Sequence, residues 1–97
     1  MSNKKIKVGI FGISGSAGEK LVEILAFHPY IEITAGYVAP DEKQENIENI
    51  VPKLKKILNL ECKSKIDWKF VEENCELIFL SLPHSVSMQY VPELMKL

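Results

Sequence analysis

The sequence predicts an α/β fold, in which a parallel sheet is built from strands that alternate with helices. Three observations support this prediction. Short apolar segments rich in β-branched residues recur along the chain, segments with apolar residues at helical spacing separate them, and a glycine-rich turn joins the first strand to the first helix. Right-handed crossovers then give about four strands in the order 3-2-1-4, which is an incomplete doubly wound parallel sheet.

The first part of the chain predicts one β-α-β unit. Residues 5–11 are a short apolar run bounded by glycine and are expected to form a buried strand. After a turn at residues 12–18, apolar residues recur at helical spacing until Pro29 ends the helix. Residues 31–39 alternate and branch like a second strand, and a turn at Pro40 ends it.

The middle of the chain predicts a helix and a short strand. The apolar residues between positions 46 and 58 form an amphipathic stripe, and Pro52 marks the start of this helix or a kink in it. Residues 61–66 are expected to form a short strand. Asp67 follows them as the cap of a short helix.

The last part of the chain predicts a strand and a helix. Residues 77–82, Leu-Ile-Phe-Leu-Ser-Leu, are expected to form a strongly buried strand that Pro83 closes. Residues 86–97 have helical character, with Pro92 as the first residue of a final helix after a short break. Because no C-cap signal and no further strand follow, we expect residues 1–97 to be the N-terminal part of a larger domain.

Composition limits the classes of function. The 97 residues are 46% apolar, which is ample for one small folded domain. The formal net charge is -1 and the charges are scattered, which argues against a nucleic-acid partner. The longest apolar run is far too short to cross a membrane, and the start of the chain does not resemble a signal peptide. We therefore expect a cytoplasmic protein that contacts neither nucleic acid nor membrane.

Cys62 and Cys75 are spaced neither as a zinc knuckle nor as the pairs of a disulfide scaffold. A catalytic cysteine needs a base beside it in the fold. A reduced, partly buried structural cysteine is the better interpretation of both residues. The sequence therefore predicts no metal site and no catalytic role for either cysteine.

The glycine-rich turn is the principal candidate site. The segment Gly-Ile-Ser-Gly-Ser-Ala-Gly at residues 12–18 follows a predicted strand and precedes a predicted helix, which is the context that a dinucleotide fingerprint requires. Gly12 would allow the tight turn, Gly15 would let the backbone approach a pyrophosphate, and Gly18 would let the helix pack on the strand. The helix N-terminus adds partial positive charge there. A turn without a ligand is the alternative. The cofactor-binding residues expected in the turn are Gly12, Ser14, Gly15, Ser16, Ala17 and Gly18.

The end of the second predicted strand indicates which dinucleotide binds. NAD-selective proteins place Asp or Glu there, about 20 residues beyond the glycines, to bind the ribose 2′-hydroxyl. Residues 36–40, Gly-Tyr-Val-Ala-Pro, contain no carboxylate, which favours NADP because a repulsion against its 2′-phosphate is missing. Lys43 is the nearest cation, beside Asp41 and Glu42, and a solvated loop lysine is an equally good interpretation of it.

Three segments together resemble N-acetyl-gamma-glutamyl-phosphate reductase. They are the glycine turn, the His28-Pro29 pair after the first helix, and residues 79–87, Phe-Leu-Ser-Leu-Pro-His-Ser-Val-Ser. Aspartate-semialdehyde dehydrogenase and many other proteins share the glycine turn. The strand that ends in Leu-Pro-His, followed by Ser-Met and then Pro-Glu-Leu, is far more specific, and the resemblance extends over nearly the whole chain.

The resemblance implies a Rossmann-type NADP-binding domain followed by a catalytic domain that is absent from this chain. Such an oxidoreductase converts N-acetyl-gamma-glutamyl phosphate to N-acetylglutamate semialdehyde in arginine biosynthesis, through a cysteine thioester and hydride transfer. The family's Pro-Gly-Cys-Tyr-Pro-Thr type of nucleophile segment has no counterpart here, so residues 1–97 alone are expected to be inactive. Alternatives are the related lysine-pathway aminoadipyl-phosphate reductase, a stand-alone nucleotide-binding or regulatory module, and a structural interaction domain.

Two further expectations concern the end of the last predicted strand and the edge of the sheet. Pro83, His84 and Ser85 follow that strand near the topological switch point, where ligands bind in open α/β sheets, and are expected to border the nicotinamide ribose. A structural cap is the alternative for His84. A partial sheet leaves an unpaired edge and exposed apolar surface, so we also expect a homo-oligomer.

Overall fold

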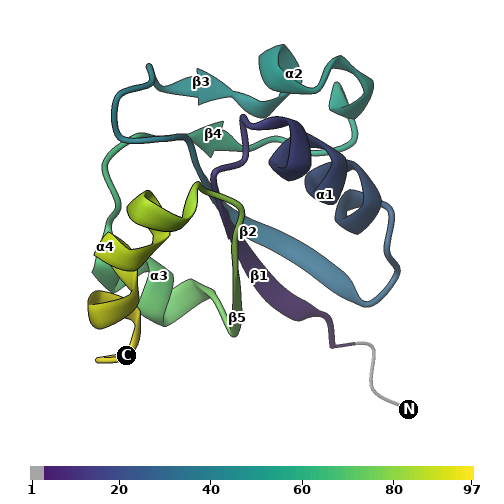
Figure 1. The fold of residues 1–97 in the computed structure, drawn as a ribbon. Helices are drawn as coiled ribbons and strands as arrows, with labels where there is room; N and C mark the ends of the chain where they lie inside the picture. The colour runs from purple at the N-terminus through teal and green to yellow at the C-terminus, as the bar shows by residue number, and fades with distance from the viewer. Residues whose placement is uncertain (1–3) are drawn as a thin grey trace.

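The computed structural model describes residues 4–97, apart from the side chains of residues 84 and 85. A central sheet of parallel strands runs through the molecule in the order β2-β1-β5 (Figure 1). Its strands are β1 (Ile6–Phe11), β2 (Ile31–Tyr37) and β5 (Leu77–Leu80).

The predicted third strand is reduced to a single parallel bridge between Tyr37 and Lys63, on the outer edge of β2. With that bridge the order of the four segments is 3-2-1-4, so the predicted α/β fold and its strand order are confirmed. The central sheet nevertheless holds three full strands, where about four were expected.

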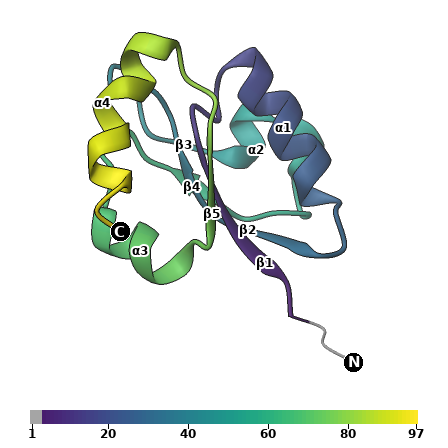
Figure 2. The same ribbon diagram turned by 60° about the horizontal axis from the view of Figure 1, so that its bottom comes forward.

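Helices cover both faces of the sheet (Figure 2). Helix α1 (Ser16–Ala26) lies on one face, and helices α3 (Trp68–Asn74) and α4 (His84–Leu94) lie on the other. Two clusters of buried residues result, which we call the α1 core and the α3 core. The α1 core contains Val8, Ile10, Ile13, Val22, Leu25, Ile33, Val38, Ile47, Val51, Leu54 and Cys62. The α3 core contains Phe11, Ala35, Tyr37 and Val71.

A bulge in β2 decides which of its residues face each core. Ile33 and Ala35 pair with consecutive residues of β1, so Thr34 is an extra residue in β2. In a regular strand Ile33 and Ala35 would face the same side of the sheet. Here Ile33 lies in the α1 core and Ala35 lies in the α3 core. The Thr34 hydroxyl donates to the carbonyl of Asn74 at 2.6 Å, which ties the bulge to the end of α3.

The predicted helix at residues 46–58 is wrong in length. This segment contains only a short helix and a 3₁₀ turn, next to a two-stranded antiparallel ribbon. Pro52 is the physical reason, because it has no N–H group to continue the α-helical pattern and its ring hinders the preceding turn. The elements are β3 (Glu45–Asn46), α2 (Ile47–Ile50), η1 (Pro52–Leu54) and β4 (Glu61–Cys62).

The final strand and helix also differ from expectation. The strand was expected to be strongly buried, but β5 lies at an edge of the described sheet, where Leu77 is 47% exposed and Leu80 is 37% exposed. Helix α4 begins earlier than expected and continues through Pro92 without a break. Because Pro92 has no N–H group, the carbonyl of Met88 has no helical partner at that position.

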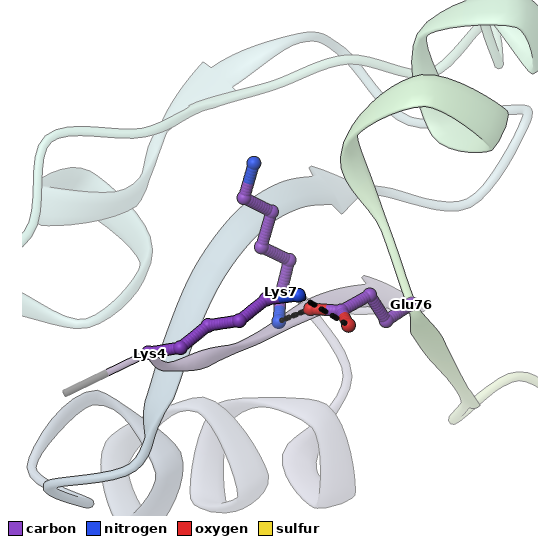
Figure 3. A network of polar contacts seen from close by, with 3 residues as sticks. All are labelled: Lys4, Lys7 and Glu76. Carbon is purple, nitrogen blue, oxygen red and sulfur yellow. Dashed lines mark hydrogen bonds and ion pairs between the residues drawn. The ribbon is translucent and has the colours of Figure 1, made fainter. Parts of the chain in front are cut away.

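A polar network joins β1 and β5 at their amino-terminal ends, which lie opposite the glycine turn (Figure 3). The N–H group of Lys7 donates to Oε2 of Glu76 at 2.9 Å, and the N–H group of Glu76 donates to the carbonyl of Lys7 at 2.8 Å. The ammonium group of Lys4 lies 3.9 Å from Oε1 of Glu76. These contacts set the register in which β5 pairs with β1.

Candidate functional site

The glycine turn lies between β1 and α1, at the carboxyl ends of the parallel strands (Figure 1). The N–H groups of Gly12 and Ile13 both donate to the carbonyl of Tyr37, at 2.8 and 3.0 Å. The turn is thereby fixed to the end of β2. Its later part, residues 15–17, is exposed to solvent.

Two of the three glycines are required by the packing of the protein itself. Gly12 has a φ of 88°, which L residues rarely adopt, and a Cβ atom there would collide with the carbonyl of Ser81. A Cβ atom on Gly18 would collide with the carbonyl of Gly12. Gly18 therefore lets α1 pack closely on the turn, whereas the sequence had predicted close packing of the helix on the strand.

Gly15 differs from the other two, because none of the described residues leaves too little room for a side chain there. Its φ of -74° and ψ of 163° are accessible to any residue. A Cβ atom would come no closer than 3.7 Å to the carbonyl oxygen of Gly12, which is ordinary van der Waals contact. The space left by the missing side chain opens to solvent above the helix N-terminus. This is the space that a pyrophosphate would use.

The helix N-terminus presents N–H groups for which the described residues offer no partner. Gly15 is the N-cap of α1, and no side-chain hydrogen bond to the cap is found there. Among the described backbone and side-chain groups, none accepts a hydrogen bond from the N–H groups of Ser14, Ser16, Ala17 or Gly18. The helix dipole concentrates partial positive charge at the same place. These groups can bind an anion together.

The segment after β5 lies beside the glycine turn. The N–H group of Ser81 donates to the carbonyl of Phe11 at 2.7 Å, which brings the ends of β1 and β5 together. Pro83 is exposed and is the N-cap of α4. Its carbonyl accepts from the N–H groups of Val86 and Ser87, at 3.0 and 2.9 Å.

The predicted site residues His84 and Ser85 begin α4, after the carboxyl end of β5 and therefore at the same end of the sheet as the glycine turn. Their side chains lie outside the described part of the chain, so their predicted role beside the nicotinamide stays a prediction. The carbonyl of Ser81, two residues before Pro83, lies next to Gly12.

An open cavity of about 410 Å³ lies beside the turn at the carboxyl end of β2. Sequence reasoning missed Glu42 as a member of this site. Oγ of Ser14 donates to Oε1 of Glu42 at 2.8 Å, so the loop after β2 touches the glycine turn. The N–H group of Glu42 donates to the carbonyl of Ala39 at 2.9 Å, and this turn carries the carboxylate back toward β2. The cavity is lined by Ser14, Glu19, Val38, Glu42, Lys43, Glu45, Asn49 and Ile50.

The environment of the two cysteines supports their interpretation as structural residues. Both are free thiols. Burial, with a smaller contribution from the carboxylates of Glu61 and Glu45, raises the pKa of the Cys62 thiol to about 12. Burial also raises the pKa of Cys75, against the effect of its contact with Thr34. Neither thiol is in an environment that favours the nucleophilic thiolate.

Across residues 4–97, no three His, Cys, Asp or Glu side chains with described positions gather into a group able to hold a metal ion. None of the helices in the same part of the chain is long and apolar enough to span a bilayer.

Comparisons with known proteins agree with this geometry. The family model described as "Semialdehyde dehydrogenase, NAD binding domain" matches residues 7–97. An N-acetyl-gamma-glutamyl-phosphate reductase of Sulfurovum sp. (strain NBC37-1) is 41% identical over 94% of this chain and 26% of that protein. A protein of the same name from Caldicellulosiruptor saccharolyticus is 42% identical over 89% of this chain and 24% of its own length.

A third relative is the [LysW]-L-2-aminoadipate/[LysW]-L-glutamate phosphate reductase of Sulfolobus acidocaldarius, which is 37% identical over 95% of this chain and 26% of that protein. The chain thus spans about a quarter of the length of these relatives. Because the family model matches residues 7–97, the chain belongs to the family of semialdehyde dehydrogenase NAD-binding domains.

Proposed function

We propose that this chain is the N-terminal, dinucleotide-binding part of a cytoplasmic reductase that converts N-acetyl-gamma-glutamyl phosphate to N-acetylglutamate semialdehyde in arginine biosynthesis. One observation supports the nucleotide site most directly. The protein's own packing requires Gly12 and Gly18, whereas Gly15 has room for a side chain and leaves open space above a helix N-terminus that has no side-chain cap. The relatives named as N-acetyl-gamma-glutamyl-phosphate reductases support the reaction.

In this proposal the residues of this chain bind the cofactor. The N–H groups of Ser14, Ser16, Ala17 and Gly18 bind the pyrophosphate, and Gly15 allows it to approach the backbone. When bound, the reduced nicotinamide supplies the hydride that reduces the acyl group. Residues 83–85, at the start of α4, border the nicotinamide ribose and limit its position.

The proposed dinucleotide is NADP(H). Residues 36–40, at the end of β2, carry no carboxylate, and Lys43 is the one cationic residue among those that line the adjacent cavity. This cavity begins beside Ser14 of the glycine turn, so one dinucleotide can reach both places.

The chemistry at the acyl phosphate is assigned to the remainder of the reductase. A thiolate there would displace phosphate to form a thioester, which the hydride reduces to the semialdehyde with release of the thiol. The relative from Sulfolobus acidocaldarius favours one alternative substrate, an aminoadipyl phosphate. The exposed β5 edge favours association of the chain with itself, as a homo-oligomer, or with that remainder.

Calorimetric titration of the chain with NADPH and, separately, NADH tests the nucleotide site. Saturable binding of NADPH with one site per chain is expected, weaker at higher salt because the pyrophosphate is charged. Absence of binding by both nucleotides to the folded chain would refute the proposal.

A chimera tests the assignment as part of a reductase rather than as a stand-alone module. In the Sulfurovum relative, the aligned N-terminal segment is replaced by this chain, and NADPH oxidation is followed with N-acetyl-gamma-glutamyl phosphate. Activity is expected. A folded chimera that binds NADPH but reduces no acyl phosphate would favour the stand-alone module, while the parent reductase serves as the control.

A further inference from the structure

We propose that Glu42 is a specificity-determining residue of the nucleotide site, and that it lets this chain accept NADH beside NADPH. The proposal rests on the proposed function, because it concerns the same bound dinucleotide. It assigns a role to a carboxylate just beyond residues 36–40, the segment that the sequence analysis found to be free of carboxylates.

The position of the cavity identifies the part of the dinucleotide that it would receive. Val38, one of its lining residues, directly follows the last residue of β2, and Ser14 belongs to the glycine turn. In open α/β sheets the adenosine ribose lies between these two places, with its 2′-substituent directed toward the end of the second strand. Glu42 and Lys43 are the charged residues of the loop that borders this position.

The charge of the cavity opposes a 2′-phosphate. Three acidic residues, Glu19, Glu42 and Glu45, are among those that line it, against one basic residue, Lys43. The chain contains no arginine, the residue that usually grips a 2′-phosphate through two parallel hydrogen bonds. Lys43 offers a charge without that geometry.

The hydrogen bonds distinguish Glu42 from the other two carboxylates. Oε1 of Glu42 accepts from the hydroxyl of Ser14 at 2.8 Å, which holds the carboxylate next to the glycine turn. Glu45 instead accepts from the side-chain amide of Asn49 at 2.8 Å, within its own segment. Because Glu42 is exposed, its second oxygen is open to a hydroxyl from solvent or ligand.

The carboxylate of Glu42 would therefore attract the ribose of NADH and repel the 2′-phosphate of NADPH. The ribose 2′-hydroxyl of NADH donates a hydrogen bond to Glu42. The 2′-phosphate of NADPH has no such hydrogen to give and is repelled by Glu42 while Lys43 attracts it. We expect the wild-type chain to bind NADH and NADPH with affinities within about tenfold of each other.

The test is the ratio of NADPH to NADH affinity, measured by calorimetry on wild-type chain and on Glu42→Gln. Glutamine keeps an oxygen that accepts from Ser14 but removes the charge. The variant is expected to bind NADPH several-fold more tightly and NADH about tenfold more weakly, because a hydrogen bond to a neutral acceptor is weaker. Lys43→Ala is expected to weaken NADPH alone.

Glu48→Gln is the matched control, since Glu48 is exposed on α2 and does not line this cavity. It should leave both affinities unchanged. If wild-type chain binds both nucleotides and Glu42→Gln leaves their ratio unchanged, the role of Glu42 is refuted while the nucleotide site stands. If the folded wild-type chain binds neither nucleotide, both proposals fail.

Discussion

The substitution Gly15→Ala tests whether the glycine at this position serves ligand binding or the stability of the fold. The new methyl group would lie 3.7 Å from the oxygen of Gly12 and 4.0 Å from the oxygen of Ser81, and the backbone already has an ordinary conformation. Alanine reduces the entropy of the unfolded chain, which stabilises by about 0.4–1 kcal/mol. Alanine is also a poorer N-cap than glycine, by a similar amount. The free energy of unfolding should change by less than about 0.5 kcal/mol.

Nucleotide binding should respond very differently. The methyl group would occupy the space through which the pyrophosphate approaches the free N–H groups, and displacing the phosphates weakens several charge-assisted hydrogen bonds at once. A loss of about 2–3 kcal/mol in binding corresponds to a dissociation constant about 30- to 150-fold higher. Calorimetric titration with NADPH measures this loss, and urea unfolding followed by Trp68 fluorescence measures stability.

Gly18→Ala is the matched control. Its methyl group would collide with the carbonyl of Gly12, so it should destabilise the fold by about 1–3 kcal/mol. The reasoning about Gly15 is refuted if Gly15→Ala binds NADPH as tightly as wild type. It is also refuted if that variant loses as much stability as Gly18→Ala, because Gly15 would then serve the fold.

Three other predictions concern stability and association. Burial raises the pKa of Cys62 from its ordinary value of 9.0 to about 12 in the folded chain, so the free energy of unfolding should fall as pH rises above 9.0, by up to about 1.4 kcal/mol per pH unit. Urea unfolding at pH 8 to 10.5 measures how the free energy of unfolding depends on pH. The same pH dependence in Cys62→Ala would show that Cys62 is not its cause. Oδ1 of Asp67 accepts from the N–H group of Phe70 at 3.1 Å, so Asp67→Ala should lower the free energy of unfolding by about 1 kcal/mol, and Asp67→Ser should restore most of it; equal losses in both variants would argue against capping. The exposed β5 edge predicts concentration-dependent self-association, which light scattering during size-exclusion chromatography detects, whereas a monomer at all concentrations would contradict it.

The features that the sequence predicted correctly depend on local chemistry. The glycine turn, the helix after it and the cap at Asp67 are each encoded within a few neighbouring residues. The strand order follows from the alternation of strands and helices together with the handedness of crossovers. These rules do not need knowledge of distant contacts.

The features that the sequence did not predict depend on contacts between distant segments. Glu42 reaches the site only because the turn after β2 folds back onto Ser14, 28 positions earlier in the chain. The helical interpretation of residues 46–58 failed at the break at Pro52. Of the apolar stripe, Ile47, Val51 and Leu54 are buried, whereas Ile57 is 53% exposed. The strand β5 has a buried-strand sequence but lies at an edge of the described sheet.

The bulge at Thr34 has a consequence for which changes in chain length this domain can accept. Thr34 is the extra residue that turns Ala35 and Tyr37 toward the α3 core. Deleting one residue there would turn both side chains toward the α1 core, or would shift the pairing of β2 with β1 by one residue. Replacing Thr34 by serine keeps the length and the hydroxyl, and costs little. Between Ile33 and Ala35, sequence variation among natural variants should therefore occur as substitutions, with insertions and deletions confined to the loops.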